Sequence, residues 1–313
     1  MIEISLHPKL IALVGPTASG KTDLALDIAK RLGHIELVSI DSMTIYRSMN
    51  VGTAKPNLSD LGGLPYHMVD LAYPWETFSM SQFQELANWK ISEVRERGNL
   101  PLLVGGTGLY LQALIDDFKI PAQWPDIRER LEIAASTDWG LAQLFRELLN
   151  LDPVAASKME PTNGRRIVRA LEVTLGSGKP FSQHGPGLFV NSCSHQMDAV
   201  GIDLPRAELF ARIETRLDAQ LSAGWLDEVE MLLGNENGMS RTAKQALGYK
   251  ELIQVVQGEL SLDEARSMIL ARTKRLAKRQ LAWFKRDPRI IWFSEIDQAR
   301  AALELIVAEN VTV

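Results

Sequence analysis

The chain has 313 residues, of which 46% are hydrophobic and 23% are charged, and its formal net charge is −5. That length corresponds to roughly two domains of about 150 residues and allows a sizeable core. The single cysteine, Cys193, excludes a disulfide framework, and the five histidines do not fall at zinc-ligand spacing. No apolar run approaches the roughly 18 residues of a membrane span, so we expect a protein of the reducing cytoplasm with no membrane partner.

The first part of the chain alternates short apolar runs with helical periodicity. Apolar runs bounded by turn or helix signals predict buried strands at 9–14, 36–40, 67–71 and 100–104, of which the third is less clear. Helical periodicity predicts one helix at 23–32 and another from about 80 to 97, which opens with an S-x-x-Q capping signature at Ser79 and Gln82. This alternation predicts an α/β fold, a parallel sheet with crossover helices.

The pattern changes after Leu114. Helical stretches without a strand series occupy 126–135, 141–149 and 163–175. We therefore expect a helical insertion domain over 121–195, set into a core formed by 1–120 and 196–313. An apolar run at 197–202 returns to the sheet, and the remainder is expected to be mostly helical. Its longest helix opens with a capping box at Ser261 and Glu264 and runs to about Arg286.

A phosphate-binding loop stands between the first predicted strand and the first helix. The pattern G-x-x-x-x-G-K-[ST] is matched by Gly15, Pro16, Thr17, Ala18, Ser19, Gly20, Lys21 and Thr22. In such a loop backbone N–H groups converge on phosphate oxygens, Lys21 adds a positive charge, and the Thr22 hydroxyl is placed to ligate Mg²⁺. Nucleoside triphosphate is the default ligand, but a diphosphate on any organic group presents similar oxygens.

Asp41 follows the second predicted strand and should stand at the carboxyl edge of the sheet, where ligands of such folds bind. It could act as a general base, orient a magnesium-bound water, or simply cap a helix. The acidic strand end expected of an ATPase is not evident elsewhere, because the run at 100–104 is followed by Gly105-Gly-Thr-Gly108. This weakens an ATPase interpretation.

The C-terminal part is basic although the whole chain is acidic. From Arg241 to Arg289 there are twelve Lys and Arg residues against five Asp and Glu residues. On the helix after Ser261, at about 100° per residue, two neighbouring arcs are cationic, one of arginines and one of lysines. Their members are Arg272, Arg275, Arg279 and Arg286 in the first and Lys274, Lys278 and Lys285 in the second. We expect this surface to bind a phosphate backbone, although some arginines could instead face the phosphate loop.

Several blocks together resemble the tRNA dimethylallyltransferases, also called tRNA isopentenyltransferases. In chain order they are GPTASGKT (15–22), SIDSMTIYRSMNVGTAKP (39–56), PLLVGGTGLYLQAL (101–114), NGRRIVRALEV (163–173), KQALGYKE (244–251) and RLAKRQLAWF (275–284). The resemblance implies a P-loop NTPase-like core with a helical C-terminal region and transfer of a dimethylallyl group, with Mg²⁺, from dimethylallyl diphosphate to N6 of the adenosine just 3′ of a tRNA anticodon. The phosphate loop would then hold the leaving diphosphate, and the insertion domain would contact the anticodon stem-loop.

The resemblance also assigns roles to residues. Asp41 matches the catalytic base, while Thr17, Lys21 and Thr22 match groups around the diphosphate, with Thr22 toward the metal. The positions matching tRNA contacts are Asp41, Ser42, Met43, Thr44, Thr107, Arg128, Arg165, Arg166, Ile167, Val168 and Arg169. Thr44 departs from the glutamine of many relatives, which puts fine details of RNA contact in doubt.

Two other function classes stay open at this point. A small-molecule or nucleotide kinase would use the same loop for ATP, with Asp41 as the base toward a hydroxyl. An RNA-binding protein with a vestigial loop is a third interpretation, and the intact Lys21 and Thr22 argue against it. For the tRNA dimethylallyltransferase interpretation we expect a monomer.

Overall fold

The structure is a computed structural model that describes residues 9–116, 120–184 and 196–311. The chain divides into two compact units, one formed by Met1–Asp117 with Cys193–Val313 and the other by Phe118–Ser192. We call them the core unit and the insertion unit. Among the described residues, no helix combines the length and the apolar character that crossing a membrane would require.

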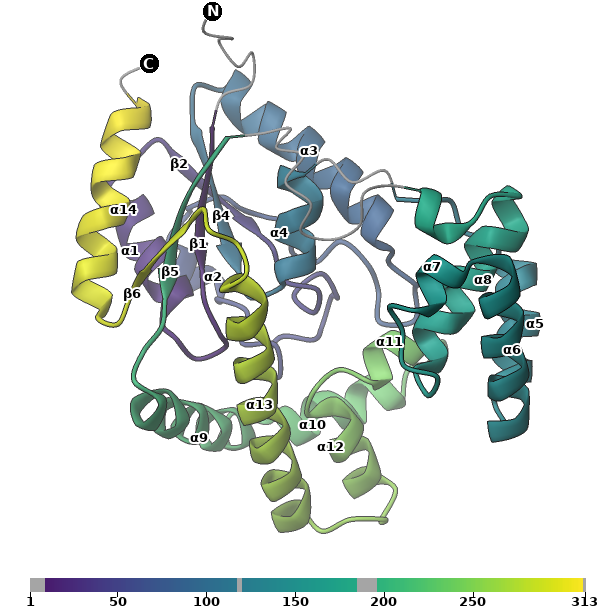
Figure 1. The fold of residues 1–313 in the computed structure, drawn as a ribbon. Helices are drawn as coiled ribbons and strands as arrows, with labels where there is room; N and C mark the ends of the chain where they lie inside the picture. Colours follow the sequence, from purple (N-terminus) through teal and green to yellow (C-terminus); the bar gives the residue numbers. More distant parts are fainter. Residues whose placement is uncertain (1–8, 117–119, 185–195, 312–313) are drawn as a thin grey trace, which may run out of the picture. The chain divides into compact units, whose positions relative to one another are not determined.

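The core unit is built on a six-stranded sheet in which every neighbouring pair is parallel (Figure 1). In spatial order the strands are β3 (Tyr66–His67), β2 (Ile35–Ser39), β4 (Leu100–Gly105), β1 (Leu10–Val14), β5 (Met197–Ile202) and β6 (Ile290–Phe293). Strand β5 pairs directly with β1, with Leu13 opposite Val200, although the whole insertion unit separates them in the sequence. The predicted α/β class with a parallel sheet is confirmed.

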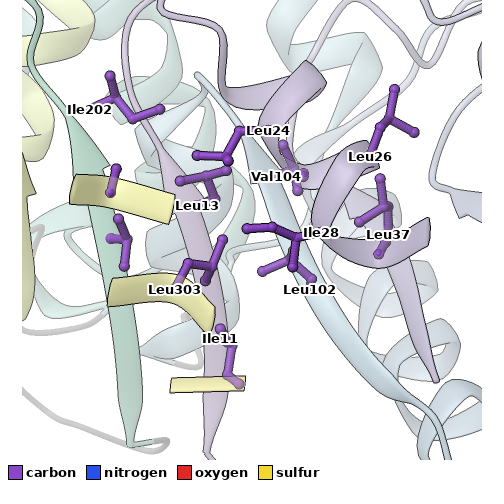
Figure 2. Packing of buried hydrophobic residues seen from close by; sticks show 14 of the residues in the cluster. Ile11, Leu13, Leu24, Leu26, Ile28, Leu37, Leu102, Val104, Ile202 and Leu303 are labelled. Atoms are coloured by element: carbon purple, nitrogen blue, oxygen red, sulfur yellow. The ribbon is translucent and has the colours of Figure 1, made fainter. Parts of the chain in front are cut away.

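Helices cover both faces of the sheet (Figure 1). Helices α1 (Lys21–Leu32) and α14 (Ile296–Val311) pack on one face, and α3 (Met80–Glu96) and α4 (Gly108–Ile115) pack on the other. Because successive strand residues point to opposite faces, β1 divides its side chains between the two layers. Figure 2 shows Ile11 and Leu13 of β1 with Ile28 of α1 and Leu303 of α14 in one layer.

The rest of the core unit is helical. It consists of α2 (Leu58–Leu61), α9 (Arg206–Ser222), α10 (Trp225–Leu233), α11 (Arg241–Lys244), α12 (Tyr249–Val256) and α13 (Leu262–Phe284). A separate buried cluster joins α9, α10, α11, α12 and α13 to the segment that follows β2, with Trp225, Tyr249 and Tyr46 among its largest fully buried side chains. The capping boxes expected at Ser79 and Ser261 are both present.

The described part of the insertion unit, residues 120–184, contains helices and no strand. They are α5 (Pro125–Ala134), α6 (Asp138–Leu151), α7 (Pro153–Ala156), α8 (Gly164–Ser177) and the 3-10 turn η1 (Phe181–Gln183). Its core is formed by apolar residues of α5, α6 and α8, among them Leu131, Leu148 and Leu171. Residues 185–195, at the C-terminal end of the expected insertion domain, lie outside the described residues.

One strand prediction was wrong and one strand was not predicted. The strand expected at 67–71 is only the two-residue β3, because Met68 and Asp70 have φ angles of 62° and 54°, which extended backbone does not allow. Strand β6 was not predicted, because it has only four residues, lies shortly after a long helix and carries no alternation typical of a strand. Tertiary pairing makes it a strand, with Ala199 of β5 opposite Ile290.

Candidate active site

The phosphate loop, residues 15–22, connects β1 to α1. Gly20 has φ of 84°, in the left-handed region that favours glycine, and serves as the N-cap of α1. Lys21 is buried, and its Nζ donates a hydrogen bond to the carbonyl of Pro16 at 3.1 Å. Ser19 Oγ is also buried and finds no hydrogen-bond partner among the described residues. A cation and an unused hydroxyl therefore lie in this loop.

Charges near Lys21 affect its protonation. Burial lowers the pKa of Lys21 to about 8, against a raising influence of the Asp41 carboxylate and a lowering influence of Arg216. Burial likewise lowers the pKa of Arg216, while Asp41 and Asp23 raise it. The charges of Lys21, Asp41 and Arg216 therefore interact with one another.

Asp41 stands just beyond the carboxyl end of β2 and is half-buried. Its Oδ1 accepts a hydrogen bond from the N–H of Met43 at 2.8 Å, which fixes the carboxylate in a local turn. No described residue donates to Oδ2. Asp41 is not a helix cap, because the next helix along the chain is α2, whose cap is Asn57.

Hydrogen bonds tie three loops together at this edge of the sheet. Thr107, after β4, accepts from the N–H of Ser42 at 3.2 Å and donates its own N–H to the carbonyl of Ile40 at 3.2 Å. Gln280 of α13 accepts from the N–H of Thr17 at 2.9 Å and donates to the carbonyl of Gly106 at 2.9 Å. The phosphate loop, the Asp41 loop and the glycine-rich loop are therefore held in one fixed arrangement.

A cavity of about 430 Å³ opens between these loops and the C-terminal helices of the core unit. Its polar lining includes Thr17, Asp41, Thr107, Arg216, Gln220 and Arg279. Apolar side chains complete it, among them Leu217, Trp225, Tyr249 and Ile269. A cavity of this size with a few convergent polar groups is typical of a small-molecule site.

Arg216 is a site residue that the sequence analysis missed. It lies on α9, lines the cavity, and makes no ion pair or hydrogen bond to any described residue. A signal was present in the sequence, because Arg216 falls one turn after Ile213 and beside Leu217, in the stripe that should face the core. An arginine in an apolar stripe is a candidate for anion binding.

The cavity wall at residues 50–53 is held by Glu228 of α10, which was also missed. The buried Glu228 carboxylate accepts hydrogen bonds from the backbone N–H groups of Asn50, Val51 and Gly52 at 2.7, 2.8 and 3.2 Å, and from the Tyr249 hydroxyl at 2.6 Å. The wall is also close-packed, since a methyl group on Gly52 would lie 2.2 Å from Trp225 Nε1. We call Glu228 with its four donors the Glu228 cluster.

The other expected tRNA-contacting residues of the core unit are near Asp41. Ser42 and Met43 line the cavity beside it. Thr44 is buried, and its hydroxyl is 2.9 Å from that of Ser39. The side chain of Thr44 is therefore engaged with β2.

The expected tRNA-contacting residues of the insertion unit differ in exposure. Arg165 and Arg166 are exposed at the start of α8, whereas Ile167 and Val168 are buried in the core of the unit. Arg169 bonds inward, to the carbonyl of Pro121 at 2.8 Å and to Glu172 at 3.0 Å.

Arg128, on α5, also pairs with a carboxylate, since its Nε lies 3.2 Å from Glu132. Its guanidinium is 3.9 Å from the fully buried Glu172 as well. Arg128 therefore takes part in the ion pairs that join α5 and α8.

The basic face of α13 divides into groups with different surroundings. Arg272 pairs with the buried Glu251, and Arg279 lines the cavity. Lys285 pairs with Asp203 at 2.6 Å. Lys274 and Lys278 turn instead toward Phe210 of α9. The cationic surface that we expected to bind a phosphate backbone is therefore divided, and Arg279 is an arginine that faces the cavity instead.

A comparison with family models identifies the chain's relatives. The model described as "IPP transferase" matches residues 44–287, and the model described as "Isopentenyl transferase" matches residues 8–71. This chain belongs to the IPP transferase family. The match to the first model includes both the Asp41 loop from Thr44 onward and the whole insertion unit.

Curated members of the family resemble the chain over nearly its full length. The tRNA dimethylallyltransferase of Streptomyces coelicolor is 42% identical over 304 residues, which cover 96% of this chain and 96% of the relative. That of Carboxydothermus hydrogenoformans is 42% identical over 310 residues, covering 98% of this chain and 97% of the relative.

Solved structures of IPP transferases share the fold. The full-length tRNA isopentenylpyrophosphate transferase of Bacillus halodurans superposes with a TM-score of 0.70 at 35% identity, covering 98% of this chain and 97% of that one. A eukaryotic dimethylallyltransferase described as acting on tRNA superposes with a TM-score of 0.78 at 25% identity, covering 97% and 79%. The P-loop-type core with its helical additions is thus a fold of this family.

Proposed function

We propose that this protein transfers the dimethylallyl group of dimethylallyl diphosphate to the N6 amine of the adenosine 3′ of a tRNA anticodon, releasing diphosphate. The observation that carries the proposal is the cavity in which the phosphate loop, the unshared oxygen of Asp41 and the unpaired Arg216 converge. The curated names and solved structures of the relatives favour this reaction over the kinase alternative.

The phosphate loop would hold the diphosphate. Lys21, Arg216 and the backbone N–H groups of residues 15–22 are the donors available to its oxygens. As the bond between C1 and the diphosphate oxygen breaks, negative charge grows on that oxygen. Preorganised cations at this place stabilise the transition state more than the ground state, and this is the main catalytic contribution we assign to them.

Asp41 would act as the base. The exocyclic amine attacks C1 of the dimethylallyl group, the diphosphate leaves with the electron pair of the broken C–O bond, and one N6 proton passes to the carboxylate. Oδ1 is occupied by the N–H of Met43, whereas no described residue bonds to Oδ2. Oδ2 is therefore the atom we assign to the proton.

The residues present suit a magnesium ion. Mg²⁺ prefers oxygen ligands and is usually held by one or two protein oxygens together with substrate phosphates. The described residues contain no cluster of three His, Cys, Asp or Glu side chains, but the buried Ser19 hydroxyl lacks a partner and the half-buried Thr22 hydroxyl lies in the first turn of α1. Thr22 would hold the ion, which when bound neutralises part of the diphosphate charge.

The protein would bind the tRNA at its anticodon stem-loop. We assign the backbone of residues 41–44 and Thr107 to the adenosine, and the exposed Arg165 and Arg166 of the insertion unit to phosphates. Ile167, Val168 and Arg169 would instead keep α8 in position, because their side chains are buried or bonded inward. The target base must leave its stack to reach C1.

We propose that the protein acts as a monomer. A tRNA substrate supports work in the cytoplasm.

The test is incubation with Mg²⁺, radiolabelled dimethylallyl diphosphate and unmodified bulk tRNA, followed by counting label in the RNA. We expect incorporation, and none into a transcript that carries guanosine at the target position. Consumption of ATP without incorporation by folded protein would overturn the proposal and favour a kinase.

A further inference from the structure

Three cations of the core unit gather around one aromatic ring away from the cavity. The guanidinium carbon of Arg206 lies 5.1 Å from the centroid of the Phe210 ring, Lys274 Nζ lies 5.3 Å from it, and Lys278 Nζ lies 5.7 Å from it. Arg206 and Phe210 belong to α9, and the lysines belong to α13. We call these four residues the Phe210 cluster.

The ring is a fixed element of this cluster. Phe210 is half-buried and packs against the hydrophobic core between the sheet and α1, so its position is set by the fold. A cation near an aromatic face is attracted by the negative face of the ring, which favours the observed positions of the three charges.

No carboxylate neutralises these charges. Within the described residues, Arg206, Lys274 and Lys278 make no ion pair or hydrogen bond. The acidic side chains on the neighbouring turns already have cationic partners, with Glu208 2.9 Å from Arg212 and Asp203 2.6 Å from Lys285.

The acidic side chains farther along α9 also have cationic partners. Glu214 and Asp218 both pair with Arg266, at 3.1 and 2.7 Å. Three like charges therefore share one small surface of a protein whose net charge is −5, and this surface attracts an anionic partner.

The cluster does not belong to the cavity. None of its residues lines the cavity, although neighbouring residues of both helices do. At about 100° per residue, Lys274 and Lys278 lie on the side of α13 opposite Leu276 and Gln280, which face the cavity. The cluster therefore faces away from the cavity. A long polyanion that enters the cavity at one point has further phosphates to contact α9 and α13 from outside.

We infer that the Phe210 cluster binds phosphates of the tRNA backbone at a place distinct from the cavity. The inference rests on the proposed function, which makes tRNA the substrate. The cluster contributes to holding the RNA and takes no part in the chemical step. Backbone contacts of this kind fix position and orientation without reading sequence.

The test compares two triple variants in binding to full-length tRNA over a salt series. Arg206→Ala/Lys274→Ala/Lys278→Ala removes the cations of the cluster. The control, Lys9→Ala/Lys30→Ala/Lys90→Ala, removes the same charge from lysines of the core unit that already bond to Asp198, the Asp60 carbonyl and Glu93. For three lost phosphate contacts we expect the slope of log K against log salt to fall by about 2–3 and the Kd to rise about 10- to 100-fold, with the control unchanged.

The KM for dimethylallyl diphosphate should stay at its wild-type value in the cluster variant. An unchanged Kd and salt slope would overturn the inference, as would an equal loss in the control, which would indicate net charge alone. A raised KM for the diphosphate with unchanged tRNA binding would also overturn it. Equal thermal unfolding of both variants verifies that they fold.

The readout separates this inference from the proposed function. If the wild type transfers label to tRNA and the cluster variant binds tRNA normally, only the inference fails. If the wild type neither binds tRNA nor transfers label, the proposed function fails. Phe210→Leu, which keeps all three cations but removes the ring that positions them, should raise the Kd by less than the triple variant.

Discussion

Two carboxylates lie beside the same cavity, that of Asp41 at the edge of the sheet and that of Glu228 in the Glu228 cluster. They differ in how many hydrogen bonds the fold gives them. Glu228 receives four hydrogen bonds, from three backbone N–H groups and the Tyr249 hydroxyl, and has no capacity left for a ligand. Asp41 receives one, from Met43, and the nearby cations Lys21 and Arg216 have no carboxylate bonded to them among the described residues. A carboxylate saturated by the fold stabilises a wall, and one left with an open oxygen is available for chemistry.

The largest expected effect tests the open carboxylate. Asp41→Asn keeps the shape and the acceptor for Met43 but cannot take a proton at neutral pH, so we expect kcat to fall about 10²- to 10⁴-fold, the usual contribution of a general base. Single-turnover transfer to tRNA measures this. Unfolding temperature and tRNA affinity should hardly change, and a variant with near wild-type kcat would remove Asp41 from the mechanism.

Arg216→Ala tests the unpaired cation. Losing one preorganised charge beside the leaving diphosphate should lower kcat/KM for dimethylallyl diphosphate by about 10²- to 10³-fold. Steady-state kinetics at saturating tRNA provide the measurement. Arg212→Ala on the same helix, where the arginine is already paired with Glu208, is the matched control and should lose little activity. Equal losses in the two variants would contradict the role of Arg216.

Glu228→Gln tests the saturated carboxylate. In the variant an NH₂ group replaces one of the two carboxylate oxygens. The NH₂ group cannot accept hydrogen bonds from the backbone N–H groups, so one or two buried donors are left unsatisfied. We expect the free energy of unfolding to fall by about 2–4 kcal/mol, as measured by urea denaturation. Glu230→Gln, exposed on the same helix, should be neutral. If Glu228→Gln unfolded like the wild type but lost all activity, the contrast between the two carboxylates would fail.

The smallest effect concerns pH. Because burial lowers the pKa of Lys21 to about 8, the free enzyme carries this charge below that pH and loses it above. We expect kcat/KM for dimethylallyl diphosphate to decline above about pH 8, by no more than tenfold per pH unit. In Lys21→Arg the cation persists to much higher pH, so this decline should disappear even if the overall rate is lower. The same decline in both proteins would assign it to another group.

Much of the fold could be predicted from local signals. The phosphate loop, the strands at 36–40, 100–104 and 197–202, and both capping boxes were all found, because each combines a short apolar run or a cap residue with a nearby break. Strand β6 was not found, because it becomes a strand only by pairing with β5. The shortened β3 reflects positive φ angles at Met68 and Asp70 that no local pattern indicates.

The candidate site was predicted only in part. Lys21 and Asp41 were found from a motif and from a position after a strand. Arg216 and Glu228 come from helices far along the chain, and their importance depends on which other elements they meet. Both nevertheless fall in apolar helical stripes, so a search for charged residues at core positions would have found them.

By itself, the sequence determined the α/β class, the phosphate loop, the resemblance to tRNA dimethylallyltransferases and the candidate base, because these depend on residues close together in the chain or on blocks in a fixed order. Only the tertiary structure decided which charged side chains are paired within the fold and which are available to a ligand. The cations of helix α13 divide among an ion pair with the buried Glu251, the cavity and the Phe210 cluster. The physical reason is that a charge is neutralised by whatever the fold places a few ångströms away, and helical periodicity does not specify that neighbour.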